Sequence, residues 1–158
     1  MRILIVGAGA VGGFFGARLI QAGADVTFLV RPARRALLER NGLAIESPHG
    51  DFTVRPKLVL AEDVTPDYDL IVLSSKAYDL ESALASVAGA SSRGLLLPVL
   101  NGLAHMAMLD ARFGRPRVMG GVVHIVSTIA ETGAIRQLTP LNVLTVGPRD
   151  PAHEALAR

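Results

Sequence analysis

Short apolar runs alternate along the chain with stretches in which apolar side chains recur at helical spacing. The run RILIV at residues 2–6 predicts a buried strand, and GAVGGFFGARLIQAG predicts a helix that ends near Gly23. A second strand is predicted for DVTFLV at residues 25–30. The segment after it, PARRALLERNG, predicts a short helix or a turn.

The same alternation continues through the middle of the chain. YDLIVLSS at residues 68–75 predicts a strand covered on both faces, and GLLLPVL at residues 94–100 predicts another. Helices are predicted for DLESALASVAGA and AHMAMLDARFG, which follow these two strands. Strands that alternate with helices predict an α/β fold, a doubly wound parallel sheet of Rossmann type.

The remaining apolar segments are shorter or carry turn residues. LAIES, FTVRP and KLVLA are separated by Gly and Pro, which predicts short pieces at the edge of a sheet. After Arg117, the segments VMGGVVHIVSTIA, GAIRQL and NVLTVG predict strands with hairpin spacing. We expect these last strands to form a small antiparallel extension near the C-terminus.

Composition narrows the class of protein. A chain of 158 residues that is 50% hydrophobic and 19% charged predicts one globular domain. The net charge is only +2 and the basic cluster near residues 31–40 lacks aromatic residues, so we expect no nucleic-acid partner. The chain has no cysteine and its four histidines are scattered, so no metal site is expected. Without a long apolar run or a secretory signal pattern, we expect a soluble, cytoplasmic protein with no membrane partner.

Glycines crowd the start of the first predicted helix. Gly7, Gly9 and Gly12 form G-x-G-x-x-G directly after a strand, which is the setting of the dinucleotide-binding fingerprint. We expect Gly7 to permit a tight turn, Gly9 to admit a pyrophosphate, and Gly12, extended by Gly16, to let the helix pack closely. The phosphates would lie at the amino end of this helix. A purely structural glycine-rich turn is the alternative. The predicted cofactor-binding loop comprises Gly7, Ala8, Gly9, Ala10, Val11 and Gly12.

Arg31 stands where NAD-specific proteins of this type carry an acidic residue, at the end of the second strand. Arg34 and Arg35 follow it, Asp25 lies at the wrong end of the strand, and no carboxylate is expected nearby. We therefore predict that Arg31 binds a 2′-phosphate and that the cofactor is NADPH. The alternative is a basic, solvated helix start.

Two polar residues follow the next central strands. Lys76 comes after the strand at residues 68–75, and Asn101 comes after the strand at residues 94–100. Ligands of open α/β sheets bind at this edge, so we predict that Lys76 lies near the cofactor and that Asn101 orients ribose and substrate hydroxyls. A solvated lysine and a simple Asn-Gly turn are the alternatives.

These segments together resemble the ketopantoate reductase (2-dehydropantoate 2-reductase) family. The resemblance rests on ILIVGAGAVGGFFGARL, DLIVLSSKAYD, LLPVLNGL and GGVVHIVSTIAETGAIRQL, which leads to LTVG. It implies NADPH contacts at Gly7 to Gly12, Arg31, Lys76 and Asn101, at the backbone near Ile125, and a substrate contact at Asn101. The implied reaction is hydride transfer from NADPH to the ketone of 2-dehydropantoate, which gives pantoate in pantothenate biosynthesis.

The resemblance also implies a catalytic lysine in a helical second domain. The chain has only Lys57 and Lys76, so we expect no catalytic residue here and place that lysine beyond Arg158. We expect residues 1–150 to form the NADP-binding domain and residues 151–158 to begin an interdomain segment. Apolar surface on the open face would then permit a homodimer. The alternatives are a reductase of another 2-oxo acid and a non-catalytic NADP(H)-sensing regulatory domain, against which Lys76 and Asn101 argue.

Overall fold

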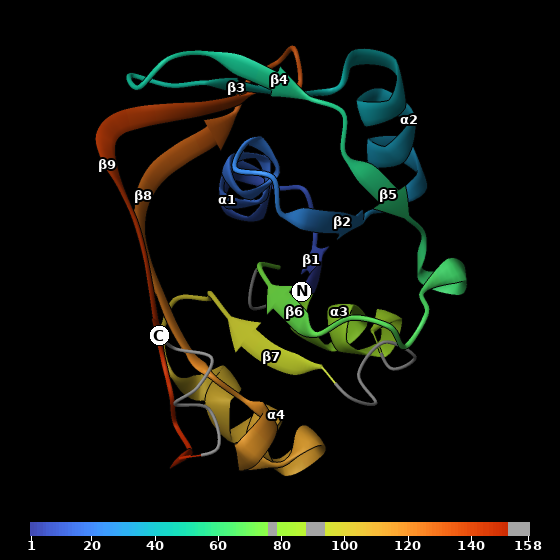
Figure 1. Ribbon diagram of the computed structural model, residues 1–158, viewed down its shortest axis with the longest axis vertical. Helices are drawn as coiled ribbons and strands as arrows, with labels where there is room; N and C mark the ends of the chain where they lie inside the picture. Colours follow the sequence, from blue (N-terminus) through green and yellow to red (C-terminus); the bar gives the residue numbers. More distant parts are fainter. Residues whose placement is uncertain (76–78, 88–93, 152–158) are drawn as a thin grey trace.

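The structure is a computed structural model that describes residues 1–75, 79–87 and 94–151 (Figure 1). Its larger sheet has five strands in the order β5-β2-β1-β6-β7, and every neighbouring pair is parallel. The strand order reverses between β1 and β6, as in a doubly wound sheet, which confirms the predicted Rossmann-type fold. The strands are β1 (Arg2–Val6), β2 (Asp25–Leu29), β5 (Lys57–Val59), β6 (Leu70–Leu73) and β7 (Leu95–Pro98).

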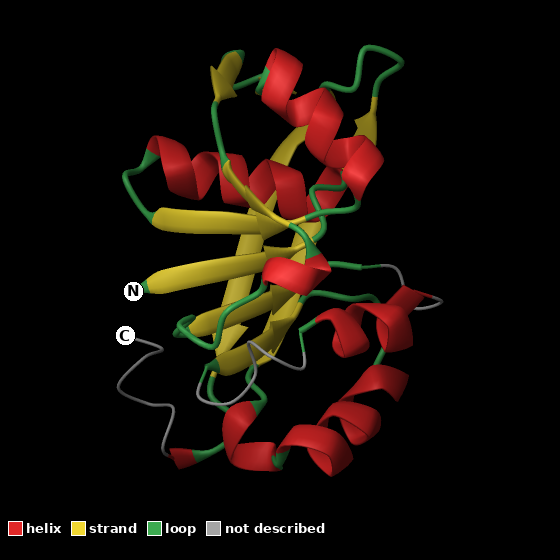
Figure 2. Ribbon diagram, turned by 90° about the vertical axis from the view of Figure 1, so that its right-hand side faces the viewer, coloured by secondary structure: helices red, strands yellow, loops and turns green. Residues whose placement is uncertain are grey.

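Helices cover both faces of this sheet, and β1 shows why. Ile3 and Ile5 belong to an apolar cluster with Phe14 of α1, whereas Leu4 packs in a second cluster with Leu84 of α3. Because side chains alternate along a strand, both faces of β1 must be apolar. Figure 2 shows α1 on one side of the sheet, with α3 and α4 on the other. The helices are α1 (Ala10–Gln21), α2 (Pro32–Asn41), α3 (Leu80–Ser86) and α4 (Ala104–Phe113).

The segment predicted as a short helix or a turn is the helix α2. Pro32 occupies its first turn, where a missing N–H costs nothing, and Gly42 follows its last residue with a φ of 73°. Two single-turn 3₁₀ helices lie elsewhere in the described chain, at Ala61–Asp63 (η1) and Arg115–Arg117 (η4).

The predicted antiparallel extension is part of a four-stranded mixed sheet in the order β4-β3-β9-β8. β8 and β9 form an antiparallel hairpin, but β3 pairs with β9 in parallel. LAIES and FTVRP belong to this second sheet, whereas KLVLA supplies β5 at the edge of the first. Which sheet each strand joins depends on hydrogen bonding between strands that are distant in the sequence, so the spacing of the segments does not predict it. The strands are β3 (Leu43–Glu46), β4 (Phe52–Val54), β8 (Gly120–Ile129) and β9 (Ile135–Gly147).

The segments GAIRQL and NVLTVG, predicted as two strands, belong to the single strand β9. The pairing register shifts here: Ile125 of β8 pairs with Asn142, and Ser127 pairs with Gln137. Residues 138–141 of β9, which include Pro140, therefore face a single residue of β8. A bulge accommodates a proline that a regular ladder would exclude, so the strand continues beyond it.

Helix α1 lies between the two sheets and approaches both closely (Figure 1). A Cβ on Gly13 would lie 2.3 Å from Ile135 of β9, and one on Gly16 would lie 2.4 Å from Phe28 of β2. A side chain at either position would require Ile135 or Phe28 to shift, so the two glycines allow α1 to pack closely against both sheets. This confirms the close packing predicted for Gly16.

Among the described helices, none combines the length and apolar character needed to cross a membrane.

Candidate cofactor-binding site

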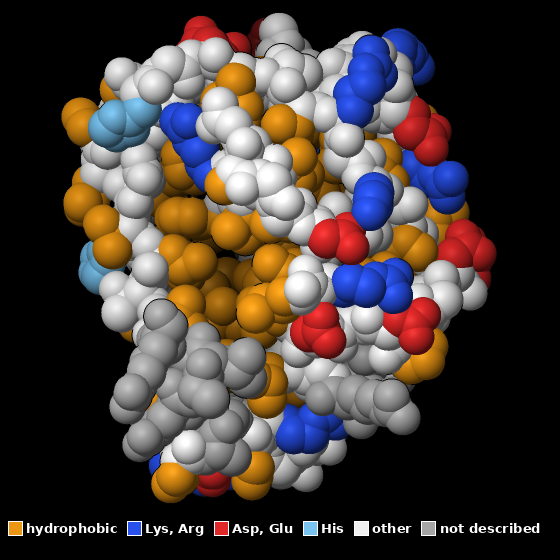
Figure 3. All heavy atoms as spheres, in the orientation of Figure 1, with side chains coloured by type: hydrophobic (Ala, Val, Ile, Leu, Met, Phe, Trp, Pro, Cys, Tyr) orange, Lys and Arg blue, Asp and Glu red, His pale blue; other side chains and the backbone are white. Residues whose placement is uncertain are grey.

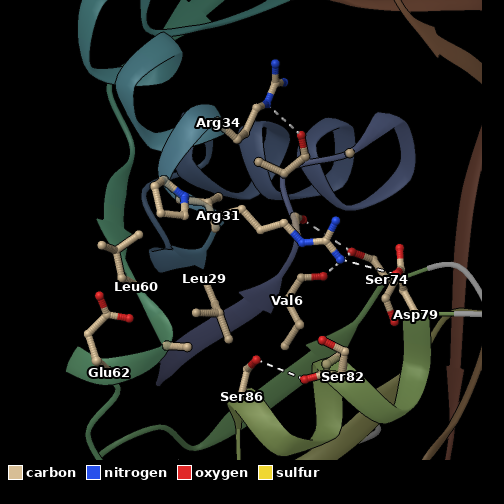
Figure 4. Close-up of a pocket in the computed structure, with 18 of the residues that line it drawn as sticks. Val6, Leu29, Arg31, Arg34, Leu60, Glu62, Ser74, Asp79, Ser82 and Ser86 are labelled. Carbon is tan, nitrogen blue, oxygen red and sulfur yellow. Dashed lines mark hydrogen bonds and ion pairs between the residues drawn. The ribbon is translucent and has the colours of Figure 1, made fainter.

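A pocket of about 440 Å³ opens at the carboxyl ends of β1, β2 and β6 (Figure 4). Loops from both sides of the point where the strand order reverses form its walls, and α3 closes one side. Ligands of doubly wound sheets bind at this place. The lining residues are Val6, Gly7, Ala8, Gly9, Leu29, Val30, Arg31, Pro32, Arg34, Leu60, Ala61, Glu62, Ser74, Ser75, Asp79, Ser82, Ala83, Ser86 and Ile129.

The glycine loop has three glycines in three different environments. Gly7 has a φ of +94°, which favours glycine, and its N–H donates to the Leu29 carbonyl at 2.9 Å. A Cβ on Gly9 would meet nothing within 4 Å, so this position faces open space. A Cβ on Gly12 would lie 2.0 Å from Ser74 Oγ and 2.7 Å from the Gly7 carbonyl. The close packing predicted for Gly12 is thus confirmed.

Helix α1 begins directly behind this loop. Gly9 is its N-cap residue, and Ala10 and Val11 start its first turn. No side chain of the described residues caps this end of α1 by a hydrogen bond. Free N–H groups at a helix start, together with the helix dipole, favour a negatively charged group. The loop therefore offers what a pyrophosphate requires.

Ser74 fixes the glycine loop from the neighbouring strand. It follows β6, and its hydroxyl donates to the Val6 carbonyl at 2.9 Å and approaches that of Gly7 at 3.4 Å. Sequence reasoning missed this residue. Its signal was its position at the end of the central strand that pairs with β1.

Arg31 lines the pocket and lies at the amino end of α2. Its side chain is 75% exposed, and its Nη2 lies 3.2 Å from Asp79 Oδ1 (Figure 4). The expectation that no carboxylate lies nearby is wrong, because Asp79 and Glu62 both line the pocket. Asp79 is the N-cap residue of α3 and Glu62 belongs to η1 after β5, so both lie far along the chain from Arg31 and the order of the strands brings them to it.

The other two arginines of the basic cluster do not extend freely into the pocket. Arg34 is half-buried, and its guanidinium donates to the Ala8 carbonyl at 3.1 Å (Figure 4) and to the Gly133 carbonyl at 3.1 Å. Burial lowers the pKa of this guanidinium. Arg34 thus ties the glycine loop to the turn between β8 and β9. Arg35 donates to Glu39 at 2.7 Å, one helical turn along α2.

Two further predicted site residues, Asn101 and Ile125, do not line this pocket. Asn101 is exposed in the loop after β7, at the same edge of the sheet but outside the pocket wall. Ile125 is half-buried in β8, and Ile129 at the end of that strand lines the pocket instead. Lys76 lies outside the described residues. The structure therefore brings together Gly7, Ala8, Gly9 and Arg31, with the first turn of α1 behind them.

The described residues contain no group of three or more histidine or acidic side chains arranged to hold a metal ion. His105 is buried in α4 and His124 is exposed on β8; neither lines the pocket. The pocket extends from the loop after β1 to α3.

A comparison with known families decides the class of protein. The model of the ketopantoate reductase PanE/ApbA family matches residues 3–151. The chain belongs to this family. The predicted resemblance is confirmed, and the fold is that of the cofactor-binding domains of these oxidoreductases.

Two relatives illustrate the range of similarity. An uncharacterized oxidoreductase, YkpB of Bacillus subtilis, is 39% identical over 136 residues, which cover 85% of this chain and 45% of the relative. The 2-dehydropantoate 2-reductase of a Nostoc species is 31% identical over 142 residues, which cover 87% of this chain and 43% of the relative.

Solved structures agree with this picture. The 2-dehydropantoate 2-reductase of Geobacter metallireducens is 32% identical with a TM-score of 0.84, covering 99% of this chain and 54% of that one. A D-mandelate dehydrogenase, solved with NADH and anilino(oxo)acetate, shares the fold at 24% identity and a TM-score of 0.85, covering 99% and 51%. The chain spans about half the length of the relatives it matches.

Proposed function

We propose that this chain is the NADPH-binding half of a reductase that converts 2-dehydropantoate to pantoate, a cytoplasmic step of pantothenate biosynthesis. The observation that carries the proposal is a single pocket shared by the glycine loop and Arg31, in a chain of the ketopantoate reductase family. The small-molecule 2-oxo acid and a homodimeric state remain parts of this proposal.

The residues of the pocket fit a phosphorylated dinucleotide. The open space at Gly9 leaves room for a pyrophosphate beside the amino end of α1. The exposed guanidinium of Arg31 suits a 2′-phosphate, since arginine binds phosphate through paired N–H groups. Ser75 Oγ is buried in the pocket wall without a hydrogen-bond partner among the described residues, which leaves it for a ligand. The nicotinamide supplies the hydride when it is bound.

Protonation of the product alkoxide needs a further group. Lys57 does not serve, because its Nζ binds Asp25 Oδ1 at 2.7 Å near the amino end of β2. Asn101 follows β7 at the edge where the substrate would lie, and we assign it to orienting ribose and substrate hydroxyls. We assign the proton donor to a lysine outside these 158 residues, in the half of the relatives that this chain does not cover.

The preference for NADPH is tested by Arg31→Ala. A charge-assisted contact to the 2′-phosphate contributes about 1.5 to 3 kcal/mol, so the variant should lose roughly tenfold to a hundredfold in NADPH affinity. Its NADH affinity should change little. Calorimetric titration with both cofactors measures this. Arg35→Ala is the matched control, since Arg35 pairs with Glu39 and does not line the pocket. Wild-type NADPH affinity in Arg31→Ala would contradict the assignment of Arg31.

Reductase activity is tested with the full-length protein. Oxidation of NADPH is followed by absorbance in the presence of 2-dehydropantoate and a panel of other 2-oxo acids. Fastest turnover of 2-dehydropantoate supports the proposal, and a preference for another 2-oxo acid would reassign the substrate. Tight binding of NADPH without turnover of any 2-oxo acid would favour the NADP(H)-sensing alternative.

A further inference from the structure

The charged side chains of the cofactor pocket nearly balance. Arg31 Nη2 lies 3.2 Å from Asp79 Oδ1, and these side chains are 75% and 38% exposed. Glu62 adds a second carboxylate from η1 on another wall. Arg34 contributes the other positive charge, but its Nε and Nη1 already donate to backbone carbonyls. The Arg31 guanidinium proposed to bind the 2′-phosphate is therefore paired with the Asp79 carboxylate.

The two side chains of this pair suit different cofactors. A phosphate monoester carries about −1.5 to −2 charges at neutral pH, so it competes with Asp79 for Arg31 and is repelled by the remaining carboxylate. A free ribose 2′-hydroxyl is a hydrogen-bond donor, and an acidic residue that accepts from it is the usual device of NAD-binding sites. The pocket thus contains both an arginine suited to the 2′-phosphate of NADPH and a carboxylate suited to the 2′-hydroxyl of NADH.

We infer that Asp79 is a specificity-determining residue that reduces the preference of this pocket for NADPH over NADH. The inference rests on the proposed function, since it requires the adenosine ribose to lie at Arg31. Asp79 lowers NADPH affinity by holding Arg31 and by repelling the phosphate. It raises NADH affinity by accepting a hydrogen bond from the 2′-hydroxyl. Glu62 has no ion pair with Arg31 within 4.0 Å among the described residues, so its effect on this choice is smaller.

The test compares dissociation constants for NADPH and NADH in the purified protein and its Asp79→Asn variant. We expect NADPH to bind about threefold to fivefold more tightly to the variant, in line with an exposed charge pair. We expect NADH to bind more weakly, so that the ratio of the two constants changes by about tenfold. Raising the salt concentration should diminish the gain for NADPH.

Two further variants separate charge from shape. Asp79→Glu keeps the carboxylate and should keep the wild-type ratio more closely than Asp79→Asn does. Glu62→Gln removes a carboxylate from the same pocket and should change the ratio by less than Asp79→Asn. Thermal melts establish that each variant is folded, and Asp79→Ser replaces Asp79→Asn if the latter is not.

The outcomes distinguish the inference from the proposed function. If both cofactors bind and the ratio is the same in wild type and Asp79→Asn, the inference is overturned while the cofactor site stands. If Glu62→Gln shifts the ratio as much as Asp79→Asn, the effect belongs to the general charge of the pocket and the assignment to Asp79 is overturned. If neither cofactor binds the wild type, the proposed function and the inference fail together.

Discussion

Gly9 and Gly12 are glycines for different reasons, although both belong to one motif. Gly9 has an ordinary φ of −82° and open space around the site of a Cβ, so the protein itself does not require glycine there. Gly12 is required by Ser74 and the Gly7 carbonyl, which leave no room for a methyl group. Under the proposed function, glycine at position 9 leaves room for the ligand, whereas glycine at position 12 is required by the fold.

Valine at these two positions should therefore have opposite consequences. Gly9→Val should abolish cofactor binding and leave the melting temperature nearly unchanged, since its side chain fills space that a pyrophosphate needs. Gly12→Val should lower the free energy of unfolding by about 1 to 3 kcal/mol through overpacking against Ser74. Urea unfolding and NADPH titration of both variants measure this. Wild-type NADPH affinity in Gly9→Val would contradict the site assignment.

His105 couples stability to pH. The side chain is only 8% exposed, and burial lowers its pKa below the ordinary value of 6.5. The unfolded chain therefore binds a proton more readily than the folded one as the pH falls below 6.5. The free energy of unfolding should decrease between pH 7.5 and pH 5, which urea unfolding at several values measures. His105→Gln should show a shallower dependence, and an identical slope would refute the contribution of this residue.

At the scale of elements, the sequence predicts individual strands, helices and loops, but it does not predict which distant strands pair with each other. The alternation of RILIV, DVTFLV and LIVL with helical segments sufficed for the parallel sheet, and the spacing of Gly7 to Gly12 sufficed for the loop. The parallel pairing of β3 with β9 has no local signature. The contact between Asp79 and Arg31 also has no local signature, because the two residues are distant in the sequence.

The continuation of β9 past Pro140 and the position of Asn101 outside the pocket wall have specific physical causes. β9 contains Pro140, and proline usually ends a strand, but a bulge absorbs it. Asn101 and the glycine loop lie at one edge of the sheet, yet the pocket at β1, β2 and β6 stops short of the loop after β7. The edge of a parallel sheet can be predicted from strand order, whereas the extent of a pocket along it depends on loop conformation.

An ion pair between Arg149 and Asp110 joins the segment just after β9 to α4. Arg149 Nη1 and Nη2 each lie 2.7 Å from one carboxylate oxygen of Asp110, and this contact holds the pKa of Asp110 below its ordinary value. Because the paired geometry needs a guanidinium, Arg149→Lys should lower the free energy of unfolding by about 1 kcal/mol. Denaturant titration checks this, with Arg35→Lys at an exposed helical pair as the control. An equal loss in both variants would contradict a special role for Arg149.

At the scale of the whole molecule, we propose that cofactor binding and completion of the reaction depend on different parts of the protein. We predict that the 158-residue chain binds NADPH but does not turn over 2-dehydropantoate. None of the described pocket residues is a lysine or histidine suited to protonate an alkoxide. Absorbance of the reduced nicotinamide, followed with chain, cofactor and substrate together, measures this. Turnover near that of the full-length protein would show that Lys76 or another residue of this chain is the proton donor.

Apolar surface is also arranged at this scale. Figure 3 shows apolar side chains gathered in a hollow on the face viewed in Figure 1, beside the hairpin of β8 and β9. On that hairpin Val122, Val126 and Leu141 are each more than half exposed, at 53%, 52% and 56%. Exposed apolar patches of this kind mark surfaces that associate. The homodimer expected from the sequence is compatible with these features and stays a prediction.

The position of α1 between the two sheets has a consequence for how the protein is made. Gly13, near the beginning of the chain, packs on Ile135, which opens its last strand. During synthesis the helix that carries the cofactor loop therefore emerges from the ribosome long before its second supporting layer exists. Its buried Phe14 must wait without that layer until β9 has been translated, because contacts so distant along the chain close late. We therefore expect the nascent chain to bind the proposed cofactor only after β9 has been translated, although the glycine loop precedes that strand by most of the sequence.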